Sequence, residues 1–213
     1  MRPFIRESGA VAPLPRANID TDQIIPKQFL KRIERTGYGP FLFNDWRYDD
    51  DGEERPEFVL NQAPYREAKI LVAGRNFGSG SSREHAVWAL ANFGIRAVIA
   101  PSFADIFKGN AAKDGLVLVE LPEDQVNTML SRAEEEPGVE ATVDLEARTV
   151  TLGELRYTFE VDEFVRNCLL NGLDDIALTL RQEDGIRAFE ASRPAWLPDL
   201  RRGPEPAGQA GAP

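Results

Sequence analysis

KILVAGRNFGSGSSREHAVWALANF, residues 69–93, predicts a strand, a turn and a helix in direct succession. The run KILVA is short, apolar and followed by a glycine, as expected of a buried strand. Residues 82–93 place Ala86, Leu90 and Phe93 on one helical face. A strand that passes directly into a helix is the unit from which parallel sheets are built.

The same alternation continues along the chain. Apolar runs at 97–100 and 116–121 are predicted as strands. The segments 103–113 and 122–133 are predicted as helices, the second with Pro122 in its first turn. This order implies right-handed crossovers. We therefore predict an α/β fold with a mostly parallel central sheet flanked by helices.

The pattern changes after Gly138. Further elements are expected in this order: strands at 143–145, 149–152 and 155–161, then helices at 163–170, 174–180 and 185–192. The three strands are close together and predict an antiparallel β ribbon. Asp162 is placed to cap the first of these helices.

Both ends of the chain lack this regularity. Residues 18–26 (NIDTDQIIP) predict a turn followed by a short strand. Residues 27–66 contain many aromatics and several glycines without a clean period, which is typical of a functional or mobile stretch. Residues 202–213 are rich in Gly, Pro and Ala and predict disorder. We expect one domain over residues 1–200, with a disordered tail over 201–213.

Composition excludes several classes of function. The 213-residue chain has a net charge of −10 and a pI of about 4.8, so it offers no general attraction for nucleic acid or anionic membrane. A single cysteine, Cys168, and a single histidine, His85, exclude an internal disulfide and a Cys/His zinc site within one chain. No apolar run is long enough to span a membrane, and residues 1–10 have no signal core. We expect a cytoplasmic protein.

The turn after the first strand of this stretch has the composition of an anion site. Gly78 and Gly80 can adopt positive φ and allow close approach of a ligand. Ser81 and Ser82 are expected at the helix start, where free N–H groups attract anions. Arg83 adds a planar guanidinium group, whose parallel N–H donors form a fork that suits the two oxygens of a carboxylate. The alternative is an ordinary glycine turn with a serine N-cap.

Other known motifs do not fit this turn. A Rossmann fingerprint needs glycine where Arg83 stands, a phosphate loop needs Gly-Lys, and a nucleophile elbow needs G-x-S-x-G. Ser81 and His85 are four residues apart, but no acid that would orient the histidine for a hydrolase triad is evident. We expect His85 to have a structural, hydrogen-bonding role.

Several segments, in the same order, resemble those of one protein family. They are NIDTDQIIP (18–26), FLFNDWRY (41–48), GSGSSREHA (78–86), SFADIF (102–107) with Asn110, NCLLNGLDDIALTL (167–180) and SRPAWLP (192–198). Together they resemble the swivelling domain of aconitase-type dehydratases, and in particular the small subunits of isopropylmalate isomerases. The resemblance covers roughly residues 1–200.

The resemblance implies a hydro-lyase subunit of leucine biosynthesis. Enzymes of this family interconvert 2-isopropylmalate and 3-isopropylmalate by removing and re-adding water through isopropylmaleate. In the family a large subunit holds a [4Fe–4S] cluster that binds the substrate as a Lewis acid. The resemblance therefore implies a complex with this large subunit, a carboxylate substrate, and no cofactor or metal on the present chain.

The resemblance also assigns roles to residues. Ser81 matches the base that moves the carbon-bound proton, with the N–H groups of Ser82 and Arg83 stabilising its alkoxide. The Arg83 side chain matches the arginine that holds a substrate carboxylate. Asp22 matches an acidic active-site residue that positions rather than reacts, although a turn or cap aspartate is an equal alternative. Thr21 is expected just behind these residues.

Residues 27–39 match the loop that senses the variable group of the substrate. Leu30 is expected to pack against an isopropyl group, and Lys31 to point to solvent. If Lys31 instead bound a further carboxylate, the chain would belong to a sister enzyme such as homoaconitase. The same residues would also suit a citraconate or maleate hydratase, or a non-enzymatic module that binds carboxylates.

The remaining reactive or aromatic residues have simpler interpretations. Cys168 lies in an apolar helical segment and is expected to be a buried structural thiol. Trp46 and Trp88 are expected to be packing residues. Asp49–Asp51 is expected to be a solvated turn and not a cation site.

Overall fold

The computed structural model describes residues 1–32 and 34–193. It divides into two compact units, Met1–Asp175 and a second one that begins at Ile176. Helix α7 (Asp175–Leu180) begins at this boundary, and α8 (Glu183–Ser192) lies in the second unit. The single domain over 1–200 stays a prediction, and the predicted tail lies outside the described residues.

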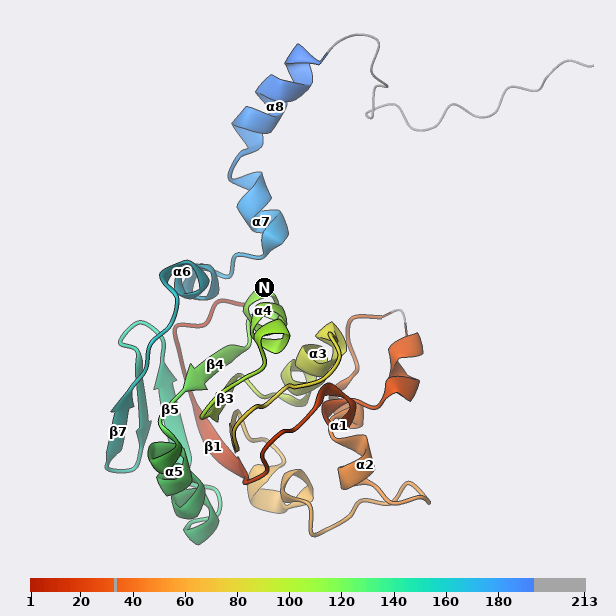
Figure 1. The fold of residues 1–213 in the computed structure, drawn as a ribbon, viewed down its shortest axis with the longest axis vertical. Helices are drawn as coiled ribbons and strands as arrows, with labels where there is room; N and C mark the ends of the chain where they lie inside the picture. Colours follow the sequence, from red (N-terminus) through yellow and green to blue (C-terminus); the bar gives the residue numbers. More distant parts are fainter. Residues whose placement is uncertain (33, 194–213) are drawn as a thin grey trace, which may run out of the picture. The chain divides into compact units, whose positions relative to one another are not determined.

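The first unit is built on a seven-stranded sheet with the order β4-β3-β2-β1-β5-β6-β7 (Figure 1). Its strands are β1 (Arg6–Leu14), β2 (Ile70–Ala73), β3 (Ala97–Ala100), β4 (Val117–Glu120), β5 (Glu140–Asp144), β6 (Thr149–Leu152) and β7 (Leu155–Thr158). Strands β1 to β4 are parallel, and β5 to β7 continue the sheet as an antiparallel ribbon. The predicted α/β fold with a parallel sheet and a ribbon is confirmed.

The helices from α3 onward in the first unit follow the predicted alternation; they are α3 (Glu84–Phe93), α4 (Asp105–Asp114), α5 (Glu123–Glu135) and α6 (Glu163–Asn171). The short helices α1 (Thr21–Ile24) and α2 (Asn44–Arg47) were not predicted. Short 3-10 helices lie at Lys27–Lys31, Gly39–Phe41, Val59–Asn61 and Ala63–Tyr65. The predicted cap of α6 is confirmed, because the carboxylate of Asp162 accepts hydrogen bonds from the N–H groups of Phe164 and Val165 at 2.9 and 3.0 Å.

The central strand β1 was not predicted. It pairs in parallel with β2, Leu14 opposite Ala73, and antiparallel with β5, Arg6 opposite Asp144. Its sequence, RESGAVAPL, contains a glycine and a proline and has polar residues at its start, so its local signal for a strand is weak. Pairing with neighbours distant in sequence on both sides overrides that weak preference.

The parallel strands are covered on both faces. Leu71 and Ala73 pack into the core beneath α3 and α4, whereas Ile70 and Val72 point to the opposite core beneath α5 and the ribbon. The irregular stretch 27–66 is itself part of the first core, since Tyr38 and Phe43 are fully buried there. Burial on two faces explains why these strands are short continuous apolar runs.

Candidate functional site

Three loops meet at the carboxyl ends of the neighbouring parallel strands β1, β2 and β3. The loop after β1 runs beside the loop after β2 through a parallel bridge between Asp20 and Ser79. A second bridge joins Phe77 to Phe103, which follows β3. The N–H of Gly78 donates to the Ile19 carbonyl at 2.7 Å. Ligands of open α/β sheets commonly bind at this edge.

The two glycines of the turn have the predicted conformation. Gly78 has φ of +76° and Gly80 has φ of +92°. A Cβ at Gly78 would lie 2.7 Å from the Cβ of Phe107 and closer still to its Cγ. The close approach at Gly78 is therefore made by a core phenylalanine of α4, and not by a ligand as the sequence suggested. This packing fixes the path of the chain towards Ser81.

The helix that follows begins later than predicted. Helix α3 starts at Glu84 with Arg83 as its N-cap, so Ser81 and Ser82 lie in the turn before it. The prediction that both serines belong to the helix start was wrong, because the Ser81 carbonyl accepts a 2.8 Å hydrogen bond from the Thr21 hydroxyl and is held out of the helix.

Ser81 and Ser82 are both exposed. In residues 1–32 and 34–193 the Ser81 hydroxyl and the N–H groups of residues 81–85 make no hydrogen bond. A group of free N–H donors at the start of a helix favours a nearby negative charge. The turn therefore offers an exposed hydroxyl next to donors that suit an anion.

Arg83 and Asp22 form a two-pronged ion pair. Nη1 and Nη2 of Arg83 donate to the two carboxylate oxygens of Asp22 at 2.5 and 2.8 Å, and Nη1 also lies 3.4 Å from the Ile25 carbonyl. The Arg83 side chain is only 12% exposed, whereas that of Asp22 is 55% exposed. Asp22 thus covers the guanidinium on its solvent side.

The pKa of the Asp22 carboxyl is lowered by this contact. Its hydrogen bonds with Arg83 are the main cause, partial burial acts in the opposite direction, and the charges of Arg83 and Lys27 lower the pKa further. Asp22 is therefore ionised at neutral pH. The structure brings together the predicted residues Asp22 and Arg83.

Asp22 and Thr21 lie on the one-turn helix α1. Asp20 caps this helix by accepting from the Gln23 N–H at 2.8 Å, while the Gln23 side chain accepts from the Asp20 N–H at 2.9 Å. The predicted short strand within 18–26 was wrong, since this capping box closes a helical turn. Thr21 is buried and joins α1 to Ser81. Asp20, and not Asp22, is the N-cap, and Asp22 is a residue of the helical turn, so its role in the site stays a prediction.

Leu30 and Lys31 end the 3-10 helix Lys27–Lys31. Leu30 is half-buried and packs on the core, and its neighbour Phe29 stacks on Phe41 with ring centroids 4.2 Å apart. Lys31 is exposed, as predicted. The contact of Leu30 with an isopropyl group stays a prediction.

His85 is held by aromatic rings. Its ring centroid lies 5.4 Å from that of Tyr38 and 4.6 Å from that of Trp88. Burial lowers the pKa of His85, the charge of Arg83 acts in the same direction, and Glu84 opposes them. Within the part of the chain that the structure describes, His85 makes no hydrogen bond with Ser81. The contacts of His85 are ring contacts rather than the predicted hydrogen bonds, and its structural role stays a prediction.

The other interpretations of single residues agree with the structure. Cys168 is 6% exposed, and Trp46 and Trp88 pack against the first core. The Asp49 carboxylate accepts from the N–H groups of Asp51 and Glu53 at 3.0 and 2.9 Å in an exposed turn. Sequence reasoning missed Lys27, whose charge and N–H both act on Asp22. No local pattern indicated that contact, because it depends on the path of α1.

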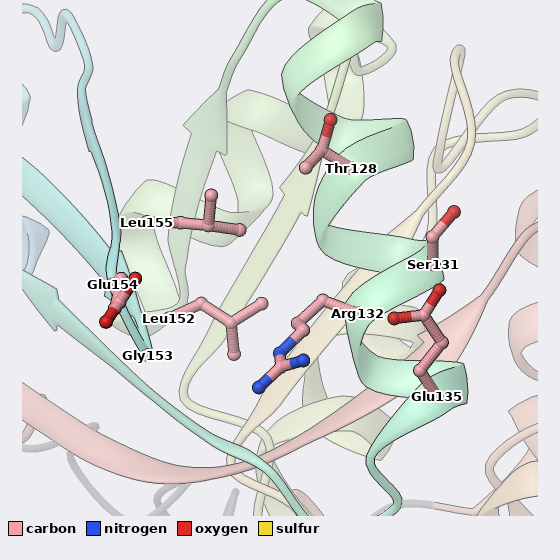
Figure 2. Close-up of a pocket in the computed structure, with 8 residues that line it drawn as sticks. All are labelled: Thr128, Ser131, Arg132, Glu135, Leu152, Gly153, Glu154 and Leu155. Carbon is pink, nitrogen blue, oxygen red and sulfur yellow. The ribbon is translucent and has the colours of Figure 1, made fainter.

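A surface hollow of about 600 Å³ lies elsewhere, between α5 and the β6–β7 turn (Figure 2). Figure 2 shows Arg132 of α5 pointing towards Leu152. Arg132 is already paired with Glu136 at 2.6 Å. A second hollow of about 360 Å³ is lined by parts of α4 and α6. None of the predicted site residues lines either of these two hollows.

Within the described residues, 1–32 and 34–193, there is neither a candidate metal-binding group nor a candidate membrane-spanning helix. No group of three or more His, Cys, Asp or Glu side chains there could hold a metal ion. No helix there is both long enough and apolar enough to cross a membrane.

Models of known protein families match consecutive parts of the chain. A family model described as the aconitase C-terminal domain matches residues 1–124, and one described as LeuD_N matches residues 127–163. A third, described as the C-terminal domain of the 3-isopropylmalate dehydratase small subunit, matches residues 175–200. The first of these covers more than half of the chain.

Individual relatives agree with the family models. The chain is 55% identical to a 3-isopropylmalate dehydratase small subunit of Brevibacillus brevis over 91% of this chain and 100% of that protein. It is 56% identical to one of Frankia alni over 93% of this chain and 98% of that protein. A crystal structure of a 3-isopropylmalate dehydratase from Methanocaldococcus jannaschii superposes with a TM-score of 0.62 at 26% identity, covering 87% of this chain and 99% of that one.

Proposed function

The chain belongs to the family of 3-isopropylmalate dehydratase small subunits, and on that premise we propose that Ser81, Arg83 and Asp22 form its share of an active site. Enzymes of this family are hydro-lyases of leucine biosynthesis that interconvert 2-isopropylmalate and 3-isopropylmalate. The observation that carries the proposal is an exposed serine hydroxyl two residues from an arginine whose fork holds a carboxylate.

Ser81 acts as the base that removes and returns the carbon-bound proton. A serine hydroxyl is a weak base unless its alkoxide is stabilised. The free N–H groups of residues 82–85 follow Ser81 directly and support that role, because N–H donors at a helix start stabilise a developing negative charge. Ser82 contributes to this stabilisation through its backbone, so its side chain is dispensable.

Arg83 binds a carboxylate of the substrate. Its guanidinium is largely buried and anchored to the Ile25 carbonyl, so its direction is fixed before a ligand arrives. Asp22 and Thr21 position this group, since Thr21 joins α1 to the Ser81 turn and Asp22 pairs with the fork. Leu30 and Lys31 follow on the adjacent 3-10 helix, where Leu30 faces the isopropyl group of the substrate and Lys31 stays in solvent.

A large subunit supplies the rest of the site. The cysteine of this chain is buried, and the described residues offer no set of ligands that fits an iron–sulfur cluster. From the family resemblance we propose that the large subunit carries the [4Fe–4S] cluster, which would supply Lewis-acid binding of the substrate hydroxyl and carboxylate. The exposure of Ser81 and Ser82 supports a site completed by a partner. The acidic chain works in the cytoplasm.

Reconstitution with the large subunit tests this function. The chain alone is expected to be inactive, and the complex to interconvert the two isopropylmalates. Ser81→Ala should lower kcat by about 10²–10⁴ without preventing assembly, which is the usual contribution of a positioned proton-transfer group. Ser82→Ala is the matched control, because it retains the backbone N–H. Equal losses in the two variants, or full turnover by the chain without its partner, would overturn the proposal.

A further inference from the structure

The Nη1–Nη2 edge of Arg83 is occupied before any substrate is present. The two parallel hydrogen bonds to Asp22 use the same donor geometry with which arginine recognises a free carboxylate. Only 12% of the Arg83 side chain is exposed, and Nη1 also faces the Ile25 carbonyl. A second carboxylate therefore cannot form the same pair of bonds while Asp22 remains in place.

We propose that Asp22 is an internal carboxylate that holds the fork of Arg83 in the free site and is displaced from it by a carboxylate of the substrate. This inference rests on the proposed role of Arg83. It adds that Asp22 and a substrate carboxylate compete for the same two donors of Arg83, Nη1 and Nη2. It assigns Asp22 a role in setting substrate affinity, as a positioning residue and not as a proton-transfer group.

The surroundings of Asp22 make displacement feasible. Asp22 is more than half exposed, so its carboxylate can turn into water without an unpaired charge being buried. The capping box of Asp20 and Gln23 holds the backbone of α1, so the side chain can move while the helical turn stays. Lys27 also attracts the Asp22 carboxylate and offers a nearby cation once Arg83 is taken.

The arrangement has a consequence for binding that a purely structural ion pair does not have. The pair is open to water on its Asp22 side, and an ion pair in contact with water is weak, so a ligand can replace Asp22 at modest cost. Removing the Asp22 charge should therefore strengthen the binding of a carboxylate ligand. If Asp22 instead served only to hold Arg83 in position, the same substitution would weaken binding.

The test uses the complex reconstituted with the large subunit and malonate as an unreactive dicarboxylate probe, with its inhibition constant as the readout. Asp22→Asn should lower the inhibition constant about two- to fivefold, which corresponds to the strength of an exposed ion pair. Asp20→Asn is the matched control, since it removes a carboxylate two residues away but retains a good N-cap. The control should leave the inhibition constant unchanged.

The following outcomes test the displacement and separate it from the proposed function. In an Arg83→Lys background, Asp22→Asn should no longer lower the inhibition constant. If Asp22→Asn raises the constant or leaves it unchanged while Arg83→Lys raises it, the displacement is wrong and the role of Arg83 stands. If Arg83→Lys leaves the constant unchanged, Arg83 does not bind the carboxylate and both statements fail. An equal fall in Asp20→Asn would attribute the effect to net charge and overturn the displacement.

Discussion

Among substitutions that add one methyl group to the Ser81 turn, Gly78→Ala should destabilise the folded chain most. An alanine at φ of +76° costs about 1–2 kcal/mol because its Cβ crowds the backbone. The added Cβ would also overlap the ring of Phe107, which is 1% exposed and packed against Phe77, and overpacking a core costs about 1–3 kcal/mol. The sum predicts a loss of about 2–5 kcal/mol in the free energy of unfolding.

Urea unfolding of the full chain, followed by circular dichroism, measures this loss, and two other glycines provide controls. Gly80→Ala has the same backbone strain, but its Cβ would lie 3.4 Å from Asp20, so about 1–2 kcal/mol is expected. Gly109→Ala lies within α4 with nothing within 4 Å, and should stabilise by about 0.5–1 kcal/mol. If Gly78→Ala costs no more than Gly80→Ala, the contact with Phe107 does not constrain the turn.

Three other predictions concern binding and pH. Arg83→Lys in the reconstituted complex keeps the charge but loses the fork, and should lower kcat/KM by the equivalent of about 1–3 kcal/mol; an unchanged value would show that the side chain does not meet the substrate. Leu30→Ala should lower kcat/KM for isopropylmalate relative to that for citramalate by the equivalent of about 1–3 kcal/mol, and an unchanged ratio would refute the contact of Leu30 with the isopropyl group. If homocitrate were the best substrate of the unsubstituted complex, Lys31 would be a carboxylate ligand. The pKa of His85 is lowered in the folded state, so neutral His85 should contribute to the free energy of unfolding above a pH of about 6.5, and this contribution should be lost as the pH falls through the folded pKa. His85→Phe should flatten that part of the curve of stability against pH. An unchanged slope would contradict the assignment.

The elements from β2 to α6 could be predicted because their signals are local. The apolar run of β2 and the helical face of α3 are visible within one window of sequence, and the observed ends differ from the predicted ones by only a few residues. Asp162 likewise acts on N–H groups two and three residues away. Such contacts depend on short-range geometry, which a single sequence contains.

The elements at the start of the chain could not be predicted for the opposite reason. Strand β1 has its partners at residues 70–73 and 140–144, and neither pairing leaves a mark in RESGAVAPL itself. The turn of α1 depends on Asp20 reaching Gln23, a pattern that also occurs in non-helical turns. The start of α3 at Glu84 follows from the bond between Thr21 and the Ser81 carbonyl, which spans 60 residues.

The same long-range contacts decide what the candidate site can do. A sequence motif can assign a carboxylate-binding role to Arg83 and an acidic role to Asp22, but it cannot show that each is the other's partner. That pairing depends on the register of β1 against β2, with Leu14 opposite Ala73, because this register brings Asp20 beside Ser79 and so places Asp22 over the fork. A shift by one residue would turn the side chains of β1 to the wrong face of the sheet and separate the two loops. Burial of the sheet fixes the register of β1 against β2. The same burial therefore also holds Asp22 on the guanidinium of Arg83, the group proposed to bind the substrate.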